Sequence, residues 1–196
     1  MAKAQVSRED WVRAAIDALI EGGVAAVRVD TLARRVGITR GSFYWHFADR
    51  DELLAAALAD WERLCTTEVI DSVQPVADPE QRLGTLLAHA LGSDARSRLE
   101  PALMAHAGHP VVAPVLRRVT ERRMEYLTRC YRDLGLGKAA ARRRAVVAYA
   151  TYVGWLELRR AVPDVLPELT GDDRSAKAVL AHLNDVLVSV THERPV

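Results

Sequence analysis

The sequence lacks the features that mark secreted, membrane-spanning and disulfide-rich proteins. It has only two cysteines, Cys65 and Cys130, which lie far apart in the chain and are too few for a disulfide framework. No apolar run approaches the roughly 20 residues that span a bilayer. Residues 1–5 lack the apolar core of a secretion signal. We therefore expect a cytoplasmic protein that makes no contact with a membrane.

Catalytic and cofactor motifs are also missing. The sequence has no Gly-x-Ser-x-Gly elbow, no glycine-rich phosphate loop and no His-Glu-x-x-His pair. His106 and His109 have a spacing that one helix could present to a metal, but Gly108 between them is expected to end the helix. We therefore expect no enzyme activity, no catalytic residue, no metal site and no cofactor.

Helical patterning fills most of the chain, and no segment alternates as a β-strand does. Apolar residues make up 49% of the 196 residues, which is typical of a globular protein. The net charge is only +1, and residues 1–50 carry eight Lys and Arg residues against six Asp and Glu residues. The pattern predicts an all-α fold, and the charge indicates that any nucleic acid would bind to one docking surface.

Residues 37–47 form the most informative stretch. Gly37 suits the left-handed conformation that ends a helix, and the Thr39 hydroxyl is expected to cap the next one. Phe43 and Phe47 are four residues apart, so they share a face that can anchor the segment to a core. The side chains left facing outward suit phosphates and base edges. They are Arg40, Ser42, Tyr44, Trp45 and His46.

The preceding residues complete a helix-turn-helix pattern. Val29, Leu32, Ala33 and Val36 follow the spacing of a one-sided helix. Residues 36–39 then form a turn of the length that joins the two helices of the motif. The alternative from spacing alone is a surface helical hairpin whose aromatic side chains pack on a neighbour.

Residues 31–47 and 49–54 together closely resemble the DNA-binding signature of TetR-type (tetracycline-repressor) regulators. The similarity begins near Ser7 and covers about the first third of the chain. It implies a three-helix helix-turn-helix DNA-binding domain at residues 1–50 and a helical effector-binding and dimerisation domain at 51–196. The resemblance implies phosphate contact by Arg50, where the family often has a lysine. The predicted DNA-contacting residues are Arg28, Thr31, Thr39, Arg40, Gly41, Ser42, Tyr44, Trp45, His46 and Arg50.

Helix-start signals and apolar stripes define the remaining elements. Ser7 with Asp10, and Asp49 with Glu52, have the spacing of capping arrangements. Further helices are expected near residues 83–91, 99–107, 112–134, 138–161 and 175–191. Aromatic, Met, His and Cys side chains in this part are core residues by default, but the resemblance implies an effector cavity among them. The candidates are Trp61, Cys65, Met104, His106, Tyr126, Cys130, Tyr149 and Trp155.

The last two helices carry more apolar surface than one chain is expected to cover. We predict that they form a homodimer interface through Val146, Val153, Leu156, Leu180, Leu183, Leu187 and Val190. The predicted function is a repressor that binds a palindromic operator in double-stranded DNA and is released by an unknown small-molecule effector. Two alternatives stay open. One is a DNA-binding regulator of the same fold that has no small-molecule effector and responds to a partner protein, and the other is a helical enzyme with a vestigial DNA-binding domain.

Overall fold

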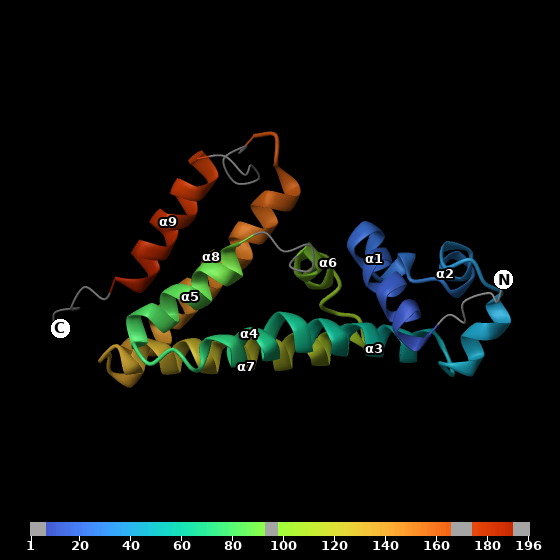
Figure 1. Ribbon diagram of the computed structural model, residues 1–196, viewed down its shortest axis with the longest axis horizontal. Helices are drawn as coiled ribbons and strands as arrows, with labels where there is room; N and C mark the ends of the chain where they lie inside the picture. The colour runs from blue at the N-terminus through green and yellow to red at the C-terminus, as the bar shows by residue number, and fades with distance from the viewer. Residues whose placement is uncertain (1–6, 93–97, 166–173, 190–196) are drawn as a thin grey trace. The chain divides into compact units, whose positions relative to one another are not determined.

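The protein is built from helices and turns throughout residues 7–92, 98–165 and 174–189, the ranges that the computed structural model describes (Figure 1). The predicted all-α fold is therefore confirmed. No helix in the described ranges is long and apolar enough to cross a bilayer. The helices group into two compact units. The first comprises the described residues up to 65 and residues 98–119, and the second comprises the other described residues. The predicted functional boundary at residue 50 stays a prediction.

The first unit contains α1 (Arg8–Ala26), α2 (Val29–Arg35), the 3₁₀ helix η1 (Arg40–Trp45), α3 (Arg50–Glu62) and α6 (Leu99–Met104). The predicted capping box at Ser7 is confirmed, because the Ser7 hydroxyl accepts from the Asp10 N–H while the Asp10 carboxylate accepts from the Ser7 N–H. Helix α1 packs against both α3 and α6. Their apolar faces form one core around the fully buried Trp11 and Trp61.

Helix α1 is interrupted at Gly22 and Gly23. Gly23 has φ +65° and ψ −162°, a left-handed conformation that glycine adopts without steric cost. The His106 ring packs directly on this residue, since a Cβ at Gly23 would lie 2.5 Å from His106 Cε1. The His106 Nδ1 atom is 2.9 Å from the Ala102 carbonyl, which holds the ring in place. One short segment after the break, ending at Ala26, leads into α2.

The second unit contains α4 (Glu68–Val73), α5 (Pro79–Leu91), α8 (Lys138–Ala161) and α9 (Arg174–Val188). A π-helical turn η2 (Arg63–Thr67) joins α3 to α4, and α7 (Val112–Asp133) begins in the first unit and ends in the second. Helix α5 lies beside α9 and also contacts α4 and α8 (Figure 1). Two buried hydrogen bonds join helices of this unit. Tyr131 OH on α7 donates to the Leu187 carbonyl on α9 at 2.8 Å, and Trp155 Nε1 on α8 donates to the Leu91 carbonyl at the end of α5 at 2.8 Å.

Candidate DNA-binding surface

Two buried phenylalanines attach the recognition helix η1 to the first unit. The Phe43 ring meets the Trp11 ring edge-on with centroids 5.2 Å apart, and it stacks on Phe47 at 5.6 Å. Both phenylalanines are almost fully buried. The Arg8 guanidinium lies over the Phe47 ring at 4.7 Å and covers the edge of this cluster. The predicted anchoring face is confirmed, and it leaves the opposite side of η1 free for a partner.

The turn before η1 matches the sequence prediction at Gly37 but not at Thr39. Gly37 has φ +73°, and Ile38 N–H donates to the Ala33 carbonyl at 3.0 Å, which closes the end of α2. The predicted Thr39 hydroxyl cap is wrong, because the Thr39 side chain makes no capping hydrogen bond. Instead the Ser42 N–H and hydroxyl both donate to the Thr39 carbonyl, at 3.2 and 3.0 Å. The tight 3₁₀ geometry brings Ser42 to that carbonyl directly.

The outward side of η1 combines exposed aromatic side chains with an arginine. Trp45 is 80% exposed and Tyr44 is 52% exposed. The Arg40 Nη2 atom donates to Tyr44 OH at 3.1 Å, and Arg40 Nη1 lies 3.6 Å from the Asp30 carboxylate. The Tyr44 hydrogen bond and the Asp30 charge raise the pKa of Arg40, so its guanidinium stays cationic. Sequence reasoning missed Asp30, which only the packing of α2 on η1 brings to Arg40.

The flanking residues surround this face with polar and small groups. Arg28 and Thr31 lie exposed at the start of α2, and Gly41 is exposed on η1. His46 is half-buried directly after η1, where its N–H donates to the Phe43 carbonyl at 2.9 Å. The predicted DNA-contacting residues between positions 28 and 46 therefore lie on α2 and η1, in the turn between them, or directly beside these helices. Their contact with DNA stays a prediction.

Arg50 occupies a different environment from the one the sequence suggests. It begins α3 after Asp49, whose carboxylate caps the helix by accepting from the Glu52 N–H at 2.8 Å. The Arg50 side chain, however, turns back onto α1 and donates to the carbonyls of Val24 and Val27. Its guanidinium is therefore already engaged within the protein.

These features define a helix-turn-helix protein whose recognition helix presents aromatic and cationic side chains. A family model described as "Bacterial regulatory proteins, tetR family" matches residues 12–57. Two regulators of Pseudomonas putida, SrpR and the uncharacterised TtgW, are each 40% identical over 58 residues, or 30% of this chain. The alignments span only 27% of SrpR and 43% of TtgW. The helix-turn-helix part of the chain is therefore similar to the DNA-binding part of TetR-type bacterial regulators, and the comparisons support a regulator of this type.

The similarity to other relatives extends beyond the helix-turn-helix. The regulator TtgR, also of P. putida, is 28% identical over 188 residues, 87% of each chain. A transcriptional regulator from Rhodococcus sp. Rha1 superposes with a TM-score of 0.75 at 23% identity, over 93% of this chain and 94% of its own. AibR, solved in complex with isovaleryl coenzyme A and operator DNA, superposes with a TM-score of 0.69 at 17% identity over 92% and 97%. The two structures show that the fold is shared.

The predicted effector residues are divided between the two units. In the first unit Trp61 lies in the core, Cys65 and Met104 are half-buried, and His106 packs on Gly23. In the second unit the candidates are Tyr126, Cys130, Tyr149 and Trp155, all part of the core or packed against it. Burial raises the pKa of both Tyr126 and Cys130. The contact of these eight side chains with an effector stays a prediction.

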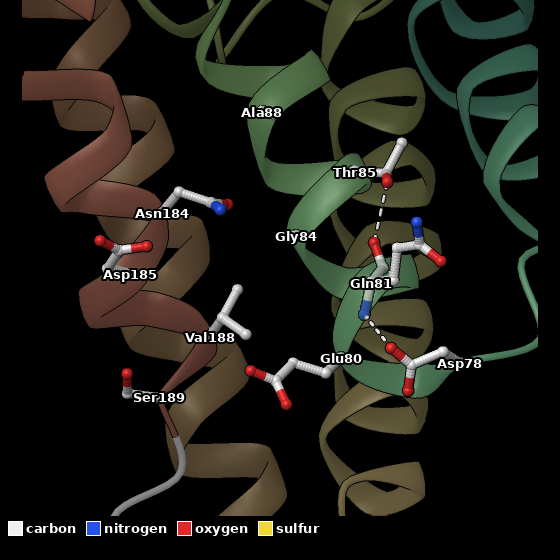
Figure 2. A pocket seen from close by; sticks show the side chains of 10 residues that line it. All are labelled: Asp78, Glu80, Gln81, Gly84, Thr85, Ala88, Asn184, Asp185, Val188 and Ser189. Atoms are coloured by element: carbon white, nitrogen blue, oxygen red, sulfur yellow. Dashed lines mark hydrogen bonds between the residues drawn. The ribbon is translucent and has the colours of Figure 1, made fainter. Parts of the chain in front are cut away.

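A groove of about 780 Å³ lies in the second unit between α5 and α9 (Figure 2). None of the predicted effector residues is among its ten lining residues. Asp78 and Glu80 come from the start of α5, and Asp185 comes from α9. Gly84 faces α9, since a Cβ there would lie in ordinary van der Waals contact, 3.5 Å from Asn184 Nδ2. The lining carries carboxylates and no Lys or Arg, so this groove does not suit an anionic molecule.

The predicted dimer residues differ in how much of each remains uncovered. Leu156 and Leu187 are buried within the second unit, and Val153, Leu180 and Leu183 are half-buried. Val146 is 52% exposed, and Val190 lies outside the described residues. Other exposed aliphatic side chains on the same two helices were not predicted. They are Val147, Leu158 and Val186.

Proposed function

We propose that the protein binds double-stranded DNA as a homodimer and regulates transcription in response to a small molecule. The observation that carries the proposal is the outward side of η1. Two exposed aromatic side chains and an oriented arginine lie on a helix that Phe43 and Phe47 hold firmly. A helix-turn-helix protein reads base edges with the first residues of its second helix. The match of residues 12–57 to the tetR family model supports the same assignment.

The residues of this surface have three proposed roles. Arg40 donates to guanine O6 and N7 in the major groove, the acceptors that an arginine fork fits best. Tyr44 and Trp45 contact thymine methyl groups and sugar–phosphate edges, while Thr31 and His46 hold phosphates and set the register. The hydrogen bond from Arg40 to Tyr44 OH limits the rotamers that the arginine can adopt. It therefore reduces the entropy lost when the surface binds DNA.

The proposed dimer joins α8 and α9 of two copies about a two-fold axis. The exposed aliphatic side chains of these helices include Val146, Val147 and Val186, and such side chains favour burial against a second copy. A two-fold dimer reads a palindromic operator, with half-sites about one helical turn or a multiple of it apart. One fold-sharing relative is known with both an acyl coenzyme A and operator DNA bound. It supports a ligand-responsive repressor without identifying the ligand.

The test begins with selection of duplexes from a random-sequence library by the full-length protein. The expected result is an inverted repeat, and a gel shift with the promoter region next to its own gene should show the same sequence. Arg40→Ala and Tyr44→Ala should each abolish binding, while circular dichroism shows unchanged helix content. Enrichment of no sequence, or normal binding by both variants, would contradict the proposal. Thermal-shift screening of metabolites, followed by competition against the selected duplex, then tests the effector.

A further inference from the structure

The Arg50 guanidinium connects the start of α3 to the end of α1. Arg50 Nε donates to the Val27 carbonyl at 2.7 Å, and Nη2 donates to the Val24 carbonyl at 2.6 Å. The remaining nitrogen, Nη1, lies 3.3 Å from the Asp51 carboxylate. The side chain is only 35% exposed. Three of its nitrogen atoms thus have partners inside the protein.

The two carbonyls that Arg50 contacts lie at the end of α1, where the Val24 carbonyl also accepts from the Val27 N–H at 3.2 Å. The break at Gly22 and Gly23 leaves only a short helical segment before Val27. The last carbonyls of a helix lack intrahelical partners and carry partial negative charge, which a cation stabilises. Val24 and Val27 are buried, so their carbonyls cannot all turn to water. A cationic donor at this position satisfies both requirements.

An arginine suits this contact better than a lysine does. Nε and Nη2 lie on one edge of the planar guanidinium, and they reach two carbonyls that are three residues apart. An ammonium group is a single point of charge without this fixed fork. A lysine at position 50 would retain the charge but lose the simultaneous, oriented contact with both carbonyls.

The contact also joins the two ends of the helix-turn-helix. Helix α2 begins at Val29, two residues after Val27, and η1 lies between α2 and α3 in the chain. Arg28, the residue before α2, makes no side-chain capping hydrogen bond, so the start of α2 depends on the segment that Arg50 holds. We infer that Arg50 is a positioning residue, which fixes the α1–α2 joint and thereby η1, and that it does not itself bind a DNA phosphate. This inference rests on the proposed function.

Arg50→Lys and Arg50→Gln test the inference, with Arg13→Gln as the control. Arg13 lies in the same unit and is largely exposed, so Arg13→Gln removes the same charge without this contact. The measurements are the melting temperature and the affinity for the duplex selected by the wild type. The affinity is measured well below the melting temperature and over a range of salt concentrations. We expect Arg50→Lys to melt several degrees lower and to bind roughly tenfold more weakly when fully folded. The salt dependence of DNA binding should be unchanged in the Arg50 variants. The control Arg13→Gln should match the wild type in melting temperature and affinity.

Two other results would overturn the inference. A phosphate-binding arginine predicts wild-type melting for Arg50→Gln and a salt slope that is less steep by about one for each lost contact. A role in stability alone predicts a lower melting temperature with unchanged affinity of the folded variant. If Arg50→Gln does not fold, Arg50→Lys still separates the roles by melting temperature and affinity, because a phosphate-binding position predicts wild-type melting for a lysine that keeps the charge. Failure of the proposed function is distinguishable from failure of this inference, because it appears as a wild type that selects no duplex. The melting measurements need no DNA, so they still test the contact between Arg50 and α1.

Discussion

Among the described residues, the exposed apolar side chains of η1 and those of α8 and α9 differ in chemistry. The surface on η1 consists of Tyr44 and Trp45 beside Arg40, with polar residues on both flanks. The surface on α8 and α9 consists of aliphatic side chains such as Val146 and Val186. Amphipathic aromatic rings beside a cation suit a polar, charged partner such as DNA. Aliphatic side chains suit a dry contact with a second protein surface.

The two surfaces also differ in how firmly the protein holds them. Phe43 and Phe47 attach η1 through rings that are buried and in contact with Trp11. Helix α9 depends more on a single buried hydrogen bond, from Tyr131 to the Leu187 carbonyl, and on half-buried leucines. The proposed DNA-binding surface is therefore complete within one chain. In the proposed dimer, the α8–α9 surface would gain further burial from a second copy.

The largest expected effect is the loss of the η1 anchor. Phe43→Ala removes a fully buried ring from the first unit and should cost about 3–5 kcal/mol in the free energy of unfolding. Tyr44→Ala, one residue later, removes an exposed ring and should change that free energy by less than about 0.5 kcal/mol. Urea denaturation of the two variants measures the difference. Equal destabilisation by both would show that the buried and exposed sides of η1 have been assigned incorrectly.

A charge on the α8–α9 surface should break the dimer without unfolding the chain. Val146→Asp places a carboxylate at an exposed position that the proposed interface desolvates, and it should weaken association by roughly 2–5 kcal/mol. Ala139→Asp adds the same charge at an exposed position in the first turn of α8. It should leave association unchanged. Sedimentation velocity at micromolar concentration measures the oligomeric state of both variants. A monomeric wild type would contradict the proposed dimer.

Substitutions at two glycines with positive φ distinguish the cost of backbone strain from the cost of a steric clash. Gly37→Ala meets no atom within 4 Å, so it should cost only the roughly 1–2 kcal/mol of the unfavourable backbone conformation. Gly23→Ala adds a clash with the His106 ring and should cost more than Gly37→Ala does. Adding His106→Ala to Gly23→Ala should recover only the part due to the clash, because the backbone conformation of Gly23 is itself open almost only to glycine. A double-mutant cycle of unfolding free energies measures that part. No coupling between the two positions would remove His106 from this contact.

Tyr131 gives a smaller effect that depends on pH. Burial raises its pKa to about 12, above the value of about 10 expected in the unfolded chain. Between these values the folded state binds more protons than the unfolded state, so stability should fall as pH rises above about 10. Tyr131→Phe should remove this part of the alkaline decline and cost about 0.5–1.5 kcal/mol at pH 7, because the hydrogen bond to Leu187 is lost. The control Tyr44→Phe should keep the alkaline decline, and denaturant titrations at several pH values compare the two.

The anchoring of η1 and the turn before it could be predicted from the sequence because their determinants are local. Phe43 and Phe47 are four residues apart, and Gly37 needs only its own backbone conformation. Thr39 was predicted wrongly because a capping residue was expected to use its side chain, whereas Ser42 bonds to its carbonyl. The Arg50 contact could not be predicted from spacing, since its acceptors lie 23 and 26 residues earlier. Only the packing of α3 on α1 brings them together.

The predicted effector residues show the limit of periodicity more clearly. Trp61, Tyr126 and Trp155 each lie on the apolar stripe of a separate helix, α3, α7 and α8, and all three are buried, as core residues are. Periodicity identifies a buried face but does not say whether a neighbouring helix or a ligand covers it. Trp155 illustrates the ambiguity, since its indole N–H is bonded to the Leu91 carbonyl. The same limit applies to α8, where the exposure of Val146 required the packed structure.

The most direct test of the central assignment is methylation protection on the duplex that the protein selects. Dimethyl sulfate methylates guanine N7 in the major groove and adenine N3 in the minor groove, so protection reports which groove η1 enters. We predict two symmetric clusters of protected guanine N7, one in each half-site. Arg40→Lys, which keeps the charge but lacks the fork, should lose protection at one guanine in each cluster. Protection confined to adenine N3, or guanine protection that Arg40→Lys leaves unchanged, would contradict base readout by η1.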